Sequence, residues 1–148
     1  MVIKGCDKLI VGVVFFGDDT VSQLADDLAR EARTHAMTPH DYDFSDEVDL
    51  LMIGCQCLMS GHKHKKEIHD FISHLDPTKV KNVAVFSLFT FKNGLLSYTV
   101  KEIIDHDLPL LRDQYECKIP MRSEITDNML QGARVYVDDM MTVVNNYY

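Results

Sequence analysis

Tryptophan is absent from this 148-residue sequence, and no apolar run approaches the roughly 20 residues that a membrane-spanning helix requires. A glycine and an aspartate interrupt the amino-terminal apolar run, and no small-residue cleavage pattern follows it. From these absences we expect no signal peptide and no membrane anchor. We therefore expect a cytoplasmic protein with one domain over residues 1–148, since 46% hydrophobic residues can build a sizeable core.

Basic side chains are in the minority, with 15 lysines and arginines against 23 aspartates and glutamates, which gives a net charge of −8. Such a chain repels the phosphates of nucleic acid, so nucleic acid is not an expected partner. An acidic surface is compatible with docking onto a partner protein with a basic surface, because opposite fields raise the association rate. Charge alone favours an ordinary acidic domain over such a docking surface, and we expect a monomer or a homodimer.

Cysteine is also scarce, and we see no disulfide framework in its four positions, Cys6, Cys55, Cys57 and Cys117. Three of them lie in or beside apolar runs, which is typical of buried thiols in a reducing compartment. Cys57 is the best candidate for a reactive thiol, because it precedes a predicted helix and lies near lysine and histidine residues. We nevertheless predict a structural Cys57 and no catalytic residue, with the reactive thiol as the alternative.

The segment CQCLMSGHKHKKEIH, residues 55–69, gathers two cysteines and three histidines, which are residue types that bind zinc. The C-x-C and H-x-H spacings depart from the usual separation of about two to four residues within each ligand pair. We therefore predict solvated surface histidines here and no metal site.

Two periodicities alternate along the chain. Apolar runs typical of buried strands occur at residues 8–16, 48–55 and 79–89, with shorter predicted strands at 41–44 and 115–120. Apolar residues recur at helical spacing within residues 20–36, 65–75, 95–108 and 125–140. Strands that alternate with helices predict an α/β fold in which a parallel sheet is covered on both faces. Five strands in a chain of this length favour the order 2-1-3-4-5.

In such sheets a ligand binds beyond the carboxyl ends of the strands, near the point where the strand order reverses. Three segments form that edge here: FFGDDT at residues 15–20, CQCLMSGHK at 55–63 and LFTFKNG at 88–94. A phosphate could lie on the amides at the start of the first helix, where the helix dipole favours negative charge. A flat ring could lie between the other two segments.

These segments resemble the flavodoxin family. DLLMIGCQCLMSG (49–61) is similar to the family's D-L-I-x-x-G-S-P-x-Y-x-G segment, KNVAVFSL (81–88) to the strand before its third flavin loop, and ARVYVDDM (133–140) to part of its last helix. The resemblance covers almost the whole chain. It implies a flavodoxin-like three-layer fold, an FMN cofactor and electron transfer to or from a redox partner.

The resemblance also implies which residues would contact the cofactor. The phosphate would lie against Gly17, Asp18, Asp19, Thr20 and Ser22. One side of the flavin ring would be flanked by Cys57, Leu58, Met59 and Gly61, and the other by Ser87, Phe89, Phe91 and Gly94.

The first loop departs from the family's pattern of hydroxyl residues around a Thr-Gly-Asn-Thr core. Here Asp18 stands for the glycine and Asp19 for the asparagine before Thr20. Each carboxylate would repel a phosphate by on the order of 3 kcal/mol at about 5 Å and an effective dielectric near 20. The same carboxylates stabilise a helix start by roughly 0.3 to 1 kcal/mol each.

Three functions therefore stay open at this point. The first is an FMN-binding electron-transfer protein. The second is a flavodoxin-fold domain that has lost flavin binding and acts as a binding or interaction module. The third is a flavin-dependent reductase acting on a small substrate.

Overall fold

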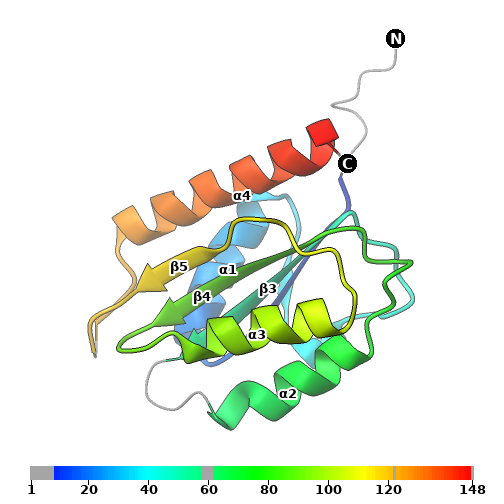
Figure 1. Ribbon diagram of the computed structural model, residues 1–148. Coiled ribbons are helices and arrows are strands. Elements are labelled where there is room, and N and C mark those ends of the chain that lie inside the picture. Colours follow the sequence, from blue (N-terminus) through cyan, green and yellow to red (C-terminus); the bar gives the residue numbers. More distant parts are fainter. Residues whose placement is uncertain (1–8, 58–61, 122, 148) are drawn as a thin grey trace.

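The computed structural model describes residues 9–57, 62–121 and 123–147, and it places a twisted five-stranded sheet between two layers of helices (Figure 1). The strands are β1 (Val11–Phe16), β2 (Ala36–Met37), β3 (Leu50–Cys57), β4 (Val83–Phe89) and β5 (Tyr115–Lys118). Neighbouring strands are all parallel, in the order β2-β1-β3-β4-β5. The predicted fold class and strand order are thus confirmed.

The helices cover both faces of this sheet. Helices α1 (Asp19–Glu31) and α4 (Asp127–Tyr147) enclose one core, and helices α2 (His62–Ser73) and α3 (Gly94–Asp105) enclose the other (Figure 1). In the described part of the chain, no helix is both long and apolar enough to cross a membrane.

The apolar residues of helix α1 recur at helical spacing, so they share one face. On that face Val21, Leu24 and Leu28 are all fully buried against the sheet. Asp27 is also buried, and it forms a two-point contact with Arg134 of α4. Arg134 Nε donates to Asp27 Oδ2 at 2.8 Å and Arg134 Nη2 donates to Asp27 Oδ1 at 3.0 Å. This bidentate pair joins the two helices of that layer.

Helix α2 buries the side chains that its periodicity predicts, which are Ile68, Phe71, Ile72 and, just after the helix, Leu75. The rings of Phe71 and Phe16 form a T-shaped pair with their centroids 5.6 Å apart. Aromatic packing therefore anchors α2 to the carboxyl end of β1.

The second strand differs from the sequence prediction. It consists of Ala36–Met37 and pairs with Val13 and Val14. The predicted strand at 41–44 is not formed: Asp41 ends a 3-10 helix at Pro39–Asp41, and residues 42–44 are irregular. Tyr42 and Phe44 turn their rings toward Phe71 of α2 instead. Their apolar side chains pack in the core under α2 and are not part of a strand.

Candidate functional site

The carboxyl ends of β1, β3 and β4 meet at one edge of the sheet, as the topology requires. Phe16 is in register with Cys55, and Cys57 is in register with Phe89. The carboxyl ends of these three strands therefore lie side by side, although they are far apart in sequence (Figure 1). This edge is where the strand order reverses, between β1 and β3.

Only Gly17 and Asp18 separate β1 from α1, so this connection has little backbone with which to wrap a ligand. Asp18 is the N-cap of α1, and its Oδ1 accepts a hydrogen bond from the Thr20 amide at 2.9 Å. The Ser22 amide donates to the Asp18 carbonyl oxygen at 3.1 Å. The helix start is thus held together by the chain's own groups.

Gln56, which the sequence analysis did not single out, completes this arrangement. Its side-chain Oε1 accepts hydrogen bonds from the amides of Val21 at 3.1 Å and Asp18 at 3.2 Å. Gln56 is only 7% exposed, and it reaches α1 from the neighbouring strand β3. The carboxamide oxygen therefore takes the position at the helix N-terminus that an anion's oxygen would take.

Gly17 makes this close approach possible. A Cβ atom at residue 17 would lie 2.5 Å from Val21 Cγ1 and 2.7 Å from Gln56 Cβ, and its φ of +155° is rare for residues with a side chain. Any larger residue would push Gln56 away from α1.

The phosphate of FMN does not fit this end of the site. The amides of Asp18, Thr20, Val21 and Ser22 all donate within the chain. Asp18 and Asp19 are exposed and add negative charge beside them. A phosphate would have to displace Gln56 and the Asp18 carboxylate while overcoming their repulsion.

The second predicted loop is described only in part. Cys57 is half-buried at the end of β3, whereas Leu58, Met59 and Gly61 lie outside the described residues. Cys55 is fully buried, and burial raises the pKa of its thiol to about 12, which leaves it protonated and inert at neutral pH.

The third predicted loop is held by Asn93, a residue that the sequence analysis missed. Asn93 Nδ2 donates to Ser87 Oγ at 2.7 Å and to Glu116 Oε1 of β5 at 3.0 Å. Ser87 is fully buried and its hydroxyl is engaged in this contact, and Gly94 begins α3. The loop is therefore tied to both β4 and β5.

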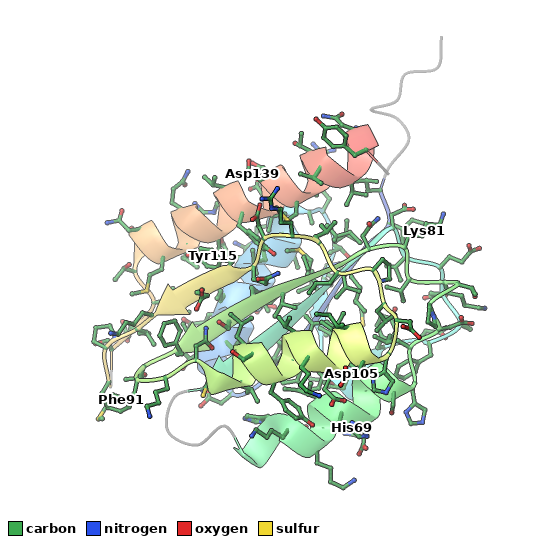
Figure 2. The ribbon with its side chains drawn as sticks, in the orientation of Figure 1. His69, Lys81, Phe91, Asp105, Tyr115 and Asp139 are labelled. Carbon is green, nitrogen blue, oxygen red and sulfur yellow. The ribbon has the colours of Figure 1, made fainter. Side chains whose placement is uncertain are left out.

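The aromatic side chains of this third loop differ in exposure. Phe89 is half-buried, whereas Phe91 is 63% exposed and lies at the tip of the loop (Figure 2). Among the predicted ring contacts that the structure describes, Phe91 has the open apolar face.

Comparison with known proteins shows which solved structures share this fold. No family model matches the sequence, and no curated protein matches it. Among solved structures, a flavodoxin from the domain Archaea superposes with a TM-score of 0.69 over 92% of this chain and 99% of its own, at 13% identity. The fold is flavodoxin-like. Oxidised flavodoxin 2 from Bacillus cereus gives a TM-score of 0.68 at 13% identity, over 90% of this chain and 98% of its own.

A larger protein contains the same fold. The flavodiiron core of Flv1 from Synechocystis matches 98% of this chain with a TM-score of 0.72 and 14% identity. This chain spans 38% of the length of that protein. At such low identities the superpositions establish the flavodoxin-like fold and leave the cofactor to be argued from the site itself.

Proposed function

We propose that this chain is a flavodoxin-fold domain that has lost FMN binding and acts as a binding module for a partner protein. The observation that carries the proposal is the occupation of the α1 N-terminus by the chain's own Asp18 and Gln56 side chains. Helix N-termini attract anions through free amides, and here the amides of Asp18, Thr20, Val21 and Ser22 have internal acceptors. The two-residue connection between β1 and α1 supports the same conclusion.

The surface available to a partner lies at the same edge. Phe91 is 63% exposed and Met121 is 49% exposed, and they follow Phe89 and Ile119, whose backbones are hydrogen bonded at 2.8 Å. Exposed large apolar side chains at neighbouring strand ends are typical of protein interfaces. The net charge of −8 favours a partner with a basic surface.

A second candidate is the FMN-binding electron carrier that the flavodoxin resemblance implies. The fold and the exposed ring of Phe91 favour it, because an open aromatic face can stack on a flavin. In that case the cofactor would supply the redox chemistry and the chain its binding and orientation. The third alternative, a flavin-dependent reductase, would additionally require a substrate that oxidises the reduced flavin.

The test is an FMN titration of the purified protein, followed by flavin fluorescence and by absorbance near about 450 nm. The proposal predicts a colourless protein and no saturable quenching. The same titration on the triple variant Asp18→Gly/Asp19→Asn/Gln56→Ala should give tighter binding than wild type, because two carboxylates and the competing oxygen are gone. Stoichiometric uptake of FMN by the wild type would instead refute the loss of FMN binding and would leave the electron carrier and the flavin-dependent reductase as candidates.

A further inference from the structure

Strand β5 is the last strand of the sheet, and its outer side is open (Figure 1). The Ile119 amide, directly after this strand, donates to the Phe89 carbonyl oxygen of β4 at 2.8 Å. Successive residues of a strand turn their backbone groups to opposite sides, so Cys117 also faces β4 while Glu116 and Lys118 face away from the sheet. Within the described chain, no group bonds the backbone of Glu116 or Lys118 on that outer side. The strand therefore has a free edge to which another strand can add.

The side chains along this edge carry opposite charges. Glu116 and Lys118 are both exposed, and they point to the same face because they are two positions apart in a strand. Glu116 Oε1 accepts a hydrogen bond from Asn93 at 3.0 Å, which leaves Oε2 for another donor. Lys118 forms no ion pair with any residue that the structure describes. A strand that pairs with β5 therefore meets one acidic and one basic side chain.

These charges make β5 complementary to a second copy of itself. In an antiparallel pair centred on Cys117, Glu116 lies opposite Lys118 of the second copy, and each such pair also exchanges two backbone hydrogen bonds. A register centred on Glu116 or on Lys118 instead places like charges opposite each other. The register centred on Lys118 also places Pro120, which has no N–H, where a donor is needed. The sequence therefore favours the register centred on Cys117.

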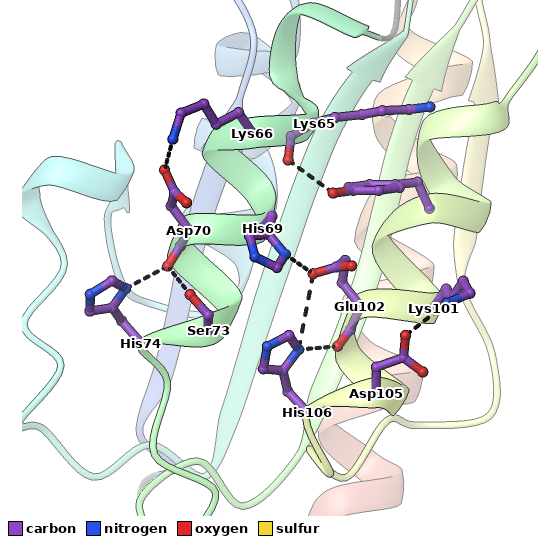
Figure 3. Close-up of polar contacts among 11 residues, drawn as sticks. Lys65, Lys66, His69, Asp70, Ser73, His74, Lys101, Glu102, Asp105 and His106 are labelled. Carbon is purple, nitrogen blue, oxygen red and sulfur yellow. Dashed lines mark hydrogen bonds and ion pairs between the residues drawn. The ribbon is translucent and has the colours of Figure 1, made fainter.

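Helix α3 has an uncovered apolar side next to β5. Its other side contacts α2, where His69 Nδ1 lies 2.5 Å from Glu102 Oε1 (Figure 3). Toward β5, a groove of about 390 Å³ lies between α3 and Gln114, the residue that precedes the strand. Val100 and Ile104 line this groove, and Ile104 is 58% exposed. A second copy that continues the sheet at β5 brings its own chain to this side of the molecule.

Helix α4 adds a second apolar residue on the opposite face of the sheet. Arg134 bonds Asp27 of α1, so the side of α4 away from that contact is the side near the sheet edge. Gly132 lies there, since a Cβ at this position would be 2.9 Å from Tyr115 Oη of β5. Val135, one turn later, is 49% exposed. Both faces of the sheet thus have exposed apolar side chains beside β5.

We infer that the chain forms a symmetric homodimer in which two β5 strands pair antiparallel and join the two sheets into one. The ion pairs between Glu116 and Lys118 set the register. Pairing of a four-residue strand alone falls short of the roughly 800 Å² per partner of a typical stable interface, so the apolar side chains of α3 and α4 supply further contact. The proposal stands whether or not FMN binds, because β5 is separate from the connection between β1 and α1.

The first test is sedimentation equilibrium of the wild-type protein from about 1 µM to about 1 mM, a range that covers weak and moderate dimers. The average mass should rise from 16.9 kDa toward twice that value. Lys118→Glu should raise the dissociation constant about 10- to 100-fold, because two attractive pairs become repulsive. Lys66→Glu is the matched control, since α2 lies on the far side of α3 from β5, and it should leave the constant unchanged. A wild type that stays monomeric at the highest concentration would overturn the inference.

Mixing two variants tests the register. Glu116→Lys and Lys118→Glu should each be mainly monomeric, with far-UV circular dichroism confirming that both remain folded. An equal mixture of the two should dimerise, because every lysine at positions 116 and 118 then faces a glutamate of the other variant. A mixture that stays monomeric, or a Lys118→Glu variant that dimerises as the wild type does, would show that these side chains do not pair.

Hydrogen exchange observed by NMR locates the interface without any substitution. At concentrations where the dimer dominates, the amides of Glu116 and Lys118 should exchange more slowly than in the dilute protein, because they gain acceptors. The Cys117 amide already faces β4 and should change less. A dimer in which the two outward amides gain no protection would be formed by another surface and would contradict the inference.

Discussion

The side-chain oxygen of Gln56 lies 3.1 Å from the backbone nitrogen of Val21, although 35 residues separate the two in sequence. This bond ties the end of β3 to the first turn of α1. It also occupies the donor that a phosphate would need, so one contact contributes both to stability and to the proposed loss of FMN binding.

Replacement of Gln56 by alanine should therefore destabilise the protein. The Val21 amide is buried at this contact, and two donors lose their acceptor, which costs about 1 to 3 kcal/mol in the free energy of unfolding. Urea denaturation measures this loss in the free energy of unfolding. Gln131→Ala is the matched control, because Gln131 is exposed on α4 and should change stability by less than about 0.5 kcal/mol. Equal effects of the two substitutions would contradict the role of Gln56.

Asp18→Ala should lower the free energy of unfolding by about 0.5 to 2 kcal/mol, because the variant loses the N-cap bond to Thr20. Asp18→Asn should retain most of the stability, since asparagine is an equally good N-cap. Thermal and urea unfolding of both variants measure the difference. If the asparagine variant is as unstable as the alanine variant, charge at the helix start dominates and not the hydrogen bond.

Removal of the hydroxyl group should affect the free energy of unfolding differently at two buried tyrosines, Tyr42 and Tyr136. Within the described residues Tyr42 Oη is buried without a partner, whereas the Tyr136 hydroxyl donates to the Asp113 carbonyl oxygen at 2.8 Å. Tyr42→Phe should leave stability at neutral pH unchanged or slightly raised, and Tyr136→Phe should lower it by about 1 kcal/mol. Urea unfolding at pH 7 tests the pair, and a destabilised Tyr42→Phe would reveal an additional acceptor.

Tyr42 should also shape the alkaline limit of stability. Burial, together with the nearby Asp46 and Asp43, raises the pKa of Tyr42 from 10.0 to about 12. The folded state thus favours the protonated phenol, whose contribution is complete below about pH 10 and is lost as the pH rises toward 12. The decline in the free energy of unfolding over this range should be smaller in Tyr42→Phe than in the wild type. If the free energy of unfolding declines equally in Tyr42→Phe and in the wild type, the raised pKa of Tyr42 is wrong.

The cysteines at the end of β3 should differ in reactivity toward an aromatic disulfide reagent at pH 8. Burial raises the pKa of Cys55 to about 12, and the residue has no exposed surface, whereas Cys57 is half-buried. Cys57→Ser should remove one thiol that reacts in the native protein, and Cys55→Ser should remove none. Reaction of Cys55 without unfolding would show that β3 opens at its end.

The fold could be predicted from the sequence because most elements carry a strong period. The apolar faces of α1 and α2 and the buried runs of β1, β3 and β4 all lie where the patterns placed them. Strand β2 could not be predicted, since Ala36–Met37 is too short to show a period. The aromatic residues at 41–44 suggested a strand because packing against α2 and packing within a sheet favour the same residue types.

The candidate site could be predicted only in outline. Topology brought the three segments to one edge, but Gln56 acts through a contact 35 residues away, which no local pattern reveals. Its only sequence signal is a polar residue within an apolar strand, on the same face as Met52, which packs in the core beside α1. Asn93 and Glu116 were missed for the same reason, because their hydrogen bond joins the loop before α3 to strand β5.

The most direct test of the central claim is an NMR titration of the ¹⁵N-labelled wild-type protein with FMN, observed at the amides of Asp18, Thr20 and Val21. Because Asp18 Oδ1 and Gln56 Oε1 already accept from these amides, we predict no saturable change in their signals at FMN concentrations in excess of the protein. Saturable, stoichiometric shifts centred on these three amides would contradict the account and would restore the first turn of α1 as a phosphate site.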